Sequence, residues 1–129
     1  MRYLTGEEVL VIHAKMIDET GGLHGVRDAH LLQSLVERPK MGFGGKELYK
    51  GVFRKAAAYF ESCAYQHVFL DGNKRTAIAI AARFLFLNGW EFRASNQETE
   101  RFVLEAVEKK FKGEIVAAWL KNHARRIKK

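Results

Sequence analysis

The chain has 129 residues, a hydrophobic fraction of 47% and a single cysteine. This length is typical of a single domain spanning residues 1–129, and the composition excludes both a disordered chain and an intrachain disulfide framework. The first residues lack the apolar core of a signal peptide, and the longest apolar run is shorter than the ~20 residues that cross a bilayer. We therefore expect a cytoplasmic protein without a membrane partner.

The net charge of +7 raises the question of nucleic acid binding. Five of the lysines and arginines lie in residues 121–129, which contain no acidic residue. Such a basic end is typical of a solvated final helix, where cations also suit the negative end of the helix dipole. Direct binding to nucleic acid is therefore not expected.

The first two predicted helices have clear beginnings and ends. Thr5 opens a Thr-x-x-Glu capping box, and Gly21-Gly22 ends the periodic apolar stretch that follows it. Asp28 is a suitable N-cap for a second helix, which should end before Pro39. In residues 39–49, glycines alternate with apolar residues and predict a loop or a small hairpin.

The rest of the chain predicts further helices. A third is expected over residues 51–66, and a fourth over residues 76–87, which are apolar nearly all round and should form the central helix. Ser95 opens another capping box, and Gly113 separates the helix that follows it from a last one. The predicted fold is an all-α helical bundle around a central apolar helix, with a small β-like flap in residues 39–49.

The most informative stretch is residues 67–75, His-Val-Phe-Leu-Asp-Gly-Asn-Lys-Arg, which opens the fourth helix. A helix N-terminus binds phosphate readily. Lys74 and Arg75 oppose the helix dipole there, at a cost of about 0.3–1 kcal/mol each, which makes sense if a polyanion binds between them. Asp71 offers a hard oxygen to Mg²⁺, and His67 could take a proton from a hydroxyl. The pattern predicts phosphoryl or nucleotidyl transfer.

Several of these residues have a structural alternative. His67 could interact with the last carbonyls of the helix before it, and Asp71 could be a turn or helix-start residue. Asn73 either caps the helix or contacts a phosphate, and the sequence leaves both open. Gly72 lets the backbone approach a phosphate closely. Phe69 should have no chemical role and should pin the loop to the core.

Cys63 and His67 lie four residues apart, so a Cys–His nucleophilic pair is conceivable. Cys63 also lies on the predicted core face, where a cysteine usually behaves as a small apolar side chain, and we favour that interpretation. The other four histidines have no metal-ligand spacing and are expected to be solvated or structural. They are His13, His24, His30 and His123.

Residues 67–75 resemble the active loop of the Fic family, His-x-Phe-x-Asp/Glu-Gly-Asn-Gly-Arg-x-x-Arg, whose members transfer an AMP group from ATP to a hydroxyl. Lys74 replaces the glycine, and Ile78 stands where the second arginine would be. At both positions the chain resembles the Doc (death-on-curing) branch of the family, whose members are the toxins of toxin–antitoxin pairs. Further Doc-like positions are spread over nearly the whole chain: Gly25-Val26-Arg27-Asp28, Leu31-Leu32, Arg38-Pro39, Gly44-Gly45, Leu48-Tyr49, Ala56-Ala57, Asn88-Gly89 and Trp119-Leu120.

This resemblance implies a reaction and its partners. In Doc-like proteins the nucleotide lies reversed, so that its γ-phosphate meets a hydroxyl of elongation factor Tu and translation stops. The implied cofactors are ATP as the substrate and Mg²⁺ on Asp71, with His67 as the base and the phosphates held by Gly72, Asn73, Lys74 and Arg75. A Phd-like or other small antitoxin would neutralise the toxin. A Fic-type AMP transferase, and an inactive binding partner or nucleic-acid-associated regulator, remain as alternatives.

The resemblance also bears on the flap and on control. In Fic-like folds the flap aligns a target peptide by strand addition, which would here involve Phe43, Gly44, Gly45 and Leu48. The inhibitory string of self-restrained Fic enzymes is absent, because no Ser or Thr is followed four residues later by Glu. Restraint is therefore expected from a separate antitoxin.

Overall fold

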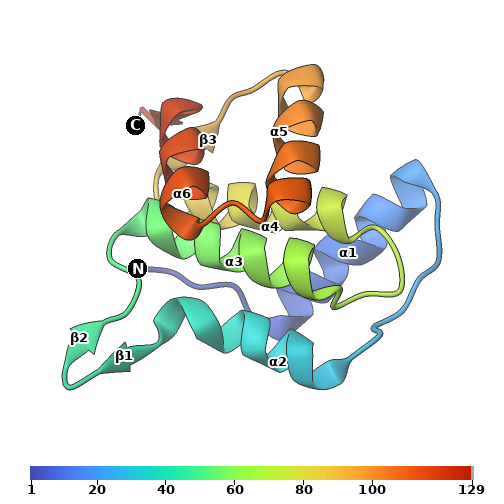
Figure 1. Ribbon diagram of the computed structural model, residues 1–129, viewed down its shortest axis with the longest axis horizontal. Coiled ribbons are helices and arrows are strands. Elements are labelled where there is room, and N and C mark those ends of the chain that lie inside the picture. The colour runs from blue at the N-terminus through green and yellow to red at the C-terminus, as the bar shows by residue number, and fades with distance from the viewer. Residues whose placement is uncertain (129) are drawn as a thin grey trace.

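The computed structural model describes residues 1–128. Six α-helices account for most of that part, and two two-stranded sheets are small additions (Figure 1). The helices are α1 (Gly6–Thr20), α2 (Ala29–Glu37), α3 (Val52–Gln66), α4 (Asn73–Leu87), α5 (Asn96–Lys109) and α6 (Gly113–Asn122). A short 3-10 helix η1 (Arg38–Lys40) and the strands β1 (Gly42–Phe43), β2 (Lys46–Glu47), β3 (Trp90–Phe92) and β4 (Ala124–Arg126) complete it. The predicted all-α class is confirmed.

The predicted helix ends are confirmed where local side chains determine them. Thr5 and Ser95 each form a complete capping box, with the glutamate three residues later bonding back to the cap. The Asp28 carboxylate accepts the first N–H groups of α2. Gly21 ends α1 with φ of 88°, a conformation that glycine adopts without strain.

The core lies between α3 and α4, which run through the middle of the molecule with α5 and α6 on one side and α2 on the other (Figure 1). Ala56 and Ala57 are fully buried on α3, and their small side chains let the neighbouring helices approach closely. Ile80, Phe84 and Leu85 are fully buried on α4. The predicted apolar helix α4 is therefore central, and α3 shares this position with it.

The C-terminal end differs from the sequence prediction. Residues 124–126 form β4, which pairs antiparallel with β3, whereas a basic helical end was expected. Helix α6 ends at Asn122. The hydrogen bonding between β3 and β4 extends to Ile127, whose N–H donates to the carbonyl of Gly89. The Arg126 guanidinium lies 5.1 Å over the ring of Trp90. Pairing with β3, whose residues lie 32 to 36 positions from their partners, is a tertiary contact that the local charge pattern does not encode.

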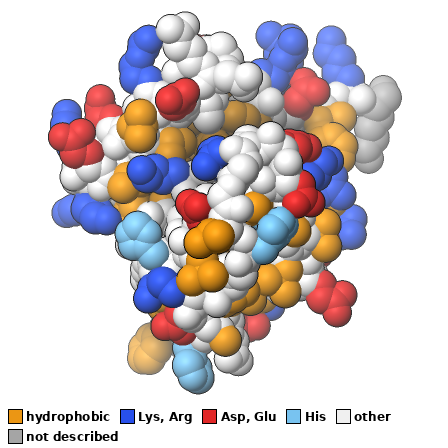
Figure 2. Space-filling view, turned by 90° about the vertical axis from the view of Figure 1, so that its right-hand side faces the viewer, with side chains coloured by type: hydrophobic (Ala, Val, Ile, Leu, Met, Phe, Trp, Pro, Cys, Tyr) orange, Lys and Arg blue, Asp and Glu red, His pale blue; other side chains and the backbone are white. Residues whose placement is uncertain are grey.

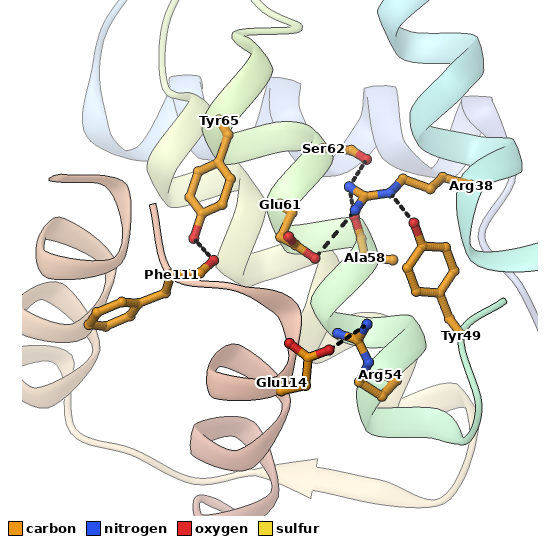
Figure 3. A network of polar contacts seen from close by, with 9 residues as sticks. All are labelled: Arg38, Tyr49, Arg54, Ala58, Glu61, Ser62, Tyr65, Phe111 and Glu114. Carbon is orange, nitrogen blue, oxygen red and sulfur yellow. Dashed lines mark hydrogen bonds and ion pairs between the residues drawn. The ribbon is translucent and has the colours of Figure 1, made fainter. Parts of the chain in front are cut away.

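A polar network ties α3 to the base of the β1–β2 hairpin and to α6 (Figure 3). Arg38 donates hydrogen bonds to the Tyr49 hydroxyl (2.7 Å) and to the Ser62 hydroxyl (3.1 Å). Arg54 pairs with Glu114 of α6 at 3.5 Å. Arg38 therefore links the segment after β2 to the C-terminal half of α3, and Arg54 links α3 to α6.

No helix within residues 1–128 is both long enough and apolar enough to span a membrane.

Candidate active site

The loop of residues 67–72 joins α3 to α4, and His67 begins it. His67 has φ of 52° and ψ of 60°, in the left-handed region that residues other than glycine adopt uncommonly. Its side chain is exposed, and its carbonyl oxygen accepts a hydrogen bond from Arg27 Nε at 2.6 Å. The candidate base therefore lies at the surface, with its backbone held by a residue 40 positions earlier.

Phe69 attaches the loop to the core. Its side chain is 1% exposed, and its ring stacks on that of His13, with the centroids 3.8 Å apart and the planes 6° apart. His13 Nε2 lies 2.8 Å from the carbonyl oxygen of Asp71. Since a carbonyl only accepts, this nitrogen carries the hydrogen. Phe69 lies where a loop anchor would lie, and its importance for the reaction stays a prediction.

Asn73 closes the loop from inside. Its side-chain oxygen accepts the Phe69 N–H and its side-chain nitrogen donates to the Phe69 carbonyl, both at 2.9 Å. The residue is 9% exposed, and its side chain does not cap α4. Of the two roles left open by the sequence, capping is therefore not the one the structure shows. Phosphate contact stays a prediction, and the inward side chain leaves the backbone N–H as the group for it.

The first turn of α4 has the donors that an anion needs. The first intrahelical bond runs from the Thr76 N–H to the Gly72 carbonyl, so the N–H groups of Asn73, Lys74 and Arg75 precede the helical ladder. Lys74 and Arg75 are exposed, and Arg75 Nη1 reaches the Thr20 carbonyl at 3.4 Å. Figure 2 views this end of the molecule, where Lys, Arg and His side chains, with a few Asp and Glu among them, surround a small group of hydrophobic ones. The backbone donors and the two cations form a positive surface.

Gly72 is required by packing as well as by conformation. It has φ of 73°, and a Cβ added to it would lie 2.8 Å from Ile17 Cδ1 of α1. A larger residue would therefore displace either the Ile17 side chain or the loop. This constraint adds to the predicted close approach of a phosphate.

Asp71 combines a turn role with the chemistry of a metal ligand. Its Oδ1 accepts the Gly72 N–H at 2.9 Å, and its Oδ2 accepts the Leu23 N–H at 3.2 Å. A Cβ at Gly22 would lie 2.7 Å from Oδ2, so a glycine is needed beside the carboxylate. Each oxygen keeps a second lone pair, and the side chain is half-buried.

These features fit Mg²⁺, which usually takes one or two protein carboxylates together with phosphates and waters. Within the described residues, no three His, Cys, Asp or Glu side chains form a metal cluster. An ion held by Asp71 would therefore need the nucleotide and water for its other ligands.

Cys63 is unsuited to nucleophilic catalysis. Its side chain is fully buried, and burial raises the pKa of the thiol well above its usual range. The Sγ atom donates weakly to the Asn73 carbonyl at 3.4 Å. It packs as the small apolar side chain that the sequence favoured, whereas His67 is exposed.

The predicted flap is present as a hairpin but does not flank the loop. Gly44 and Gly45 form its two-residue turn with φ of 57° and 80°, and Phe43 and Leu48 are 90% and 58% exposed. The hairpin precedes the first residue of α3, whereas the loop follows the last, so the length of α3, about 22 Å at 1.5 Å per residue, separates them (Figure 1). The structure therefore does not bring Phe43, Gly44, Gly45 and Leu48 together with His67.

Sequence reasoning did not predict that two particular residues would hold the loop. His13 and Arg27 come from α1 and from the segment before α2, and both bond loop carbonyls. His13 was expected to be solvated or structural, and it is structural. The apolar periodicity of α1 places His13 on the same face as Val9 and Ile17, which is the one local signal of its burial.

Comparison with known proteins identifies the family. The Fic/DOC family model matches residues 3–85, which include the whole loop and the first turn of α4. A protein named Toxin Doc from Mycolicibacterium smegmatis is 41% identical over 92 residues, or 71% of this chain and 68% of the relative. A protein named Protein kinase doc from Escherichia phage P1 is 34% identical over 89 residues, or 69% of this chain and 70% of the relative. The chain belongs to the Fic/Doc family, and within it to the Doc branch.

Proposed function

We propose that this chain is a Doc-like toxin that transfers the γ-phosphate of ATP to a hydroxyl of a host protein, with elongation factor Tu as the expected target. The observation that carries the proposal is the first turn of α4, where three N–H groups outside the helical ladder and two exposed cations lie just after His67 and Asp71. The names of the two relatives, a toxin and a protein kinase, support the same activity.

The residues divide the work of the reaction between them. His67 accepts the proton of the attacking hydroxyl, which requires an exposed imidazole. Lys74, Arg75 and the N–H groups of the first turn hold the phosphates and stabilise the charge on the transferring group. Asp71 would hold Mg²⁺, which when bound neutralises charge on the phosphates.

Mass spectrometry tests the proposal directly. Purified chain is incubated with ATP, Mg²⁺ and elongation factor Tu, and the mass of the factor is measured before and after. A phosphate-sized increase supports the proposal. An AMP-sized increase would assign a Fic-type AMP transferase instead, and no change on this or any other host protein would favour an inactive binding partner.

Lys74 should select between these two reactions. Its charge and volume occupy the position where AMP-transferring relatives have glycine, so Lys74→Gly should reduce phosphoryl transfer and permit AMP transfer. Parallel labelling with γ-labelled and α-labelled ATP measures the two products. Arg83→Gly is unsuitable as a control because it breaks a helix interior, whereas Arg83→Ala removes an exposed cation of α4 away from the loop. An unchanged γ-label in Lys74→Gly would show that Lys74 does not select the chemistry.

We further propose that a separate antitoxin restrains this chain. The net charge of +7 suggests that the inhibitory segment of the antitoxin is acidic, so its binding should weaken as salt rises. Expression of the chain alone should arrest growth, and co-expression with a small antitoxin encoded beside it should restore growth through a stable complex. Growth curves and binding measured at two salt concentrations check this. Normal growth of the native host without any partner would contradict the toxin–antitoxin interpretation.

A further inference from the structure

Arg27 lies between α1 and α2, and its side chain reaches the C-terminal end of α3. Its Nε donates to the carbonyl oxygen of His67 at 2.6 Å, and its Nη2 donates to that of Gln66 at 3.0 Å. Its backbone N–H donates to the Val68 carbonyl at 2.8 Å. One residue thus bonds three consecutive carbonyls where the helix becomes the active loop.

The end of α3 needs such a partner. In the other five helices the N–H of the C-cap residue bonds a carbonyl of the last turn, whereas within residues 1–128 no such bond forms at His67. His67 instead takes the left-handed conformation that usually belongs to glycine after a helix. A guanidinium can satisfy the free carbonyls, and its charge suits the negative end of the helix dipole. The Arg27 side chain therefore takes the place of the backbone hydrogen bond that ends the other helices and is missing at the end of α3.

The segment around Arg27 supports the rest of the loop as well. Val26 forms a β-bridge with Phe69, and the Leu70 N–H bonds the Gly25 carbonyl at 3.1 Å. These bonds hold Phe69 and Leu70 without Arg27's side chain. The guanidinium is therefore specific to the beginning of the loop, where His67 lies.

We propose that Arg27 is a positioning residue for the transfer reaction, which fixes the backbone of His67 and thereby the place of its imidazole. The inference rests on the proposed role of His67 as the base. A base must lie within hydrogen-bond distance of the proton that it removes, and a small displacement lowers the rate strongly. Arg27 acts through His67 and does not touch the substrate.

Two substitutions in the full chain separate the contributions of Arg27. Arg27→Met keeps the apolar stem and the backbone N–H and removes the side-chain donors, whereas Arg27→Lys keeps the charge but not the planar fork that reaches two carbonyls. Arg83→Met is the matched control, because Arg83 is an exposed arginine of α4 that stacks on Phe86, about three helical turns after the loop. We expect kcat to fall by about ten- to a hundredfold in Arg27→Met, less in Arg27→Lys, and not in Arg83→Met. The KM values for ATP and for the target, and the Kd for ATP, should stay unchanged.

A second measurement tests the placement of His67 without any transfer. The Cα chemical shift of His67 reports its backbone conformation, and it should change in Arg27→Met but not in Arg83→Met. An unchanged kcat, an unchanged His67 shift or a weakened ATP affinity in Arg27→Met would each overturn the proposal, the last by making Arg27 a nucleotide ligand. If the wild-type chain transfers nothing, the proposed function fails, and the chemical shifts still decide whether Arg27 fixes His67.

Discussion

Replacing His67 with alanine should lower the rate of transfer by about 10²–10⁴-fold, the usual loss when a general base is removed. The side chain is exposed and makes no hydrogen bond to the rest of residues 1–128, so its removal should leave the core intact. Toxicity should disappear for the same reason, at unchanged protein level. Growth after induction and the initial rate of phosphate transfer measure the two effects.

The backbone of His67 calls for a second variant. Alanine is disfavoured at a φ of 52°, whereas asparagine tolerates this conformation and cannot act as a base at neutral pH. His67→Asn should therefore be as inactive as His67→Ala, with a thermal midpoint closer to that of the wild type. His30→Ala, at an exposed histidine of α2, should keep full activity. Continued growth arrest by His67→Asn at equal expression would disprove the assignment of the base.

The sequence predicts well what neighbouring residues determine. The capping boxes at Thr5 and Ser95 and the N-cap at Asp28 lie within three residues of their partners, so their residue types are sufficient to place the helix ends. The predicted phosphate site in the first turn of α4 also rests on local features. It depends on a helix start and on two adjacent cations.

Contacts between distant segments explain what the sequence did not predict. The His13–Asp71 bond joins residues 58 positions apart, and the Arg27–His67 bond joins residues 40 apart. Neither His13 nor Arg27 lies in a local pattern that indicates which distant residue it contacts. The distance of the hairpin from the loop has the same origin, because it depends on the direction of α3, which local alternation in residues 39–49 does not encode.

The loop itself shows both kinds of information. The order of residues 67–75 indicates the chemistry, while the conformation that presents it depends on α1 and on the segment before α2. In a sequence with the same nine residues but without these supports, nothing would fix the positions of the side chains that we propose for the transfer reaction. Phe69 joins the loop to α1 by stacking on His13. We therefore expect its loss to lower both stability and activity.

Phe69→Ala should destabilise the protein by about 3–5 kcal/mol, the usual cost of removing a buried phenylalanine ring. The ring is 1% exposed and stacks on His13, so its loss leaves a cavity and frees the histidine that holds the Asp71 carbonyl. Urea unfolding measures the free energy of unfolding. A transfer assay at low temperature, where the variant stays folded, measures the activity of the folded protein. This activity should also fall, because Asp71 is no longer fixed. Phe43→Ala is the matched control, since that ring is 90% exposed and its removal should change stability by no more than about 0.5 kcal/mol.

Because Phe69 and His13 are in contact, the double variant with His13→Ala should lose less stability than the two single variants added together. Equal unfolding midpoints for Phe69→Ala and Phe43→Ala, or strict additivity with His13→Ala, would show that the stack does not anchor the loop.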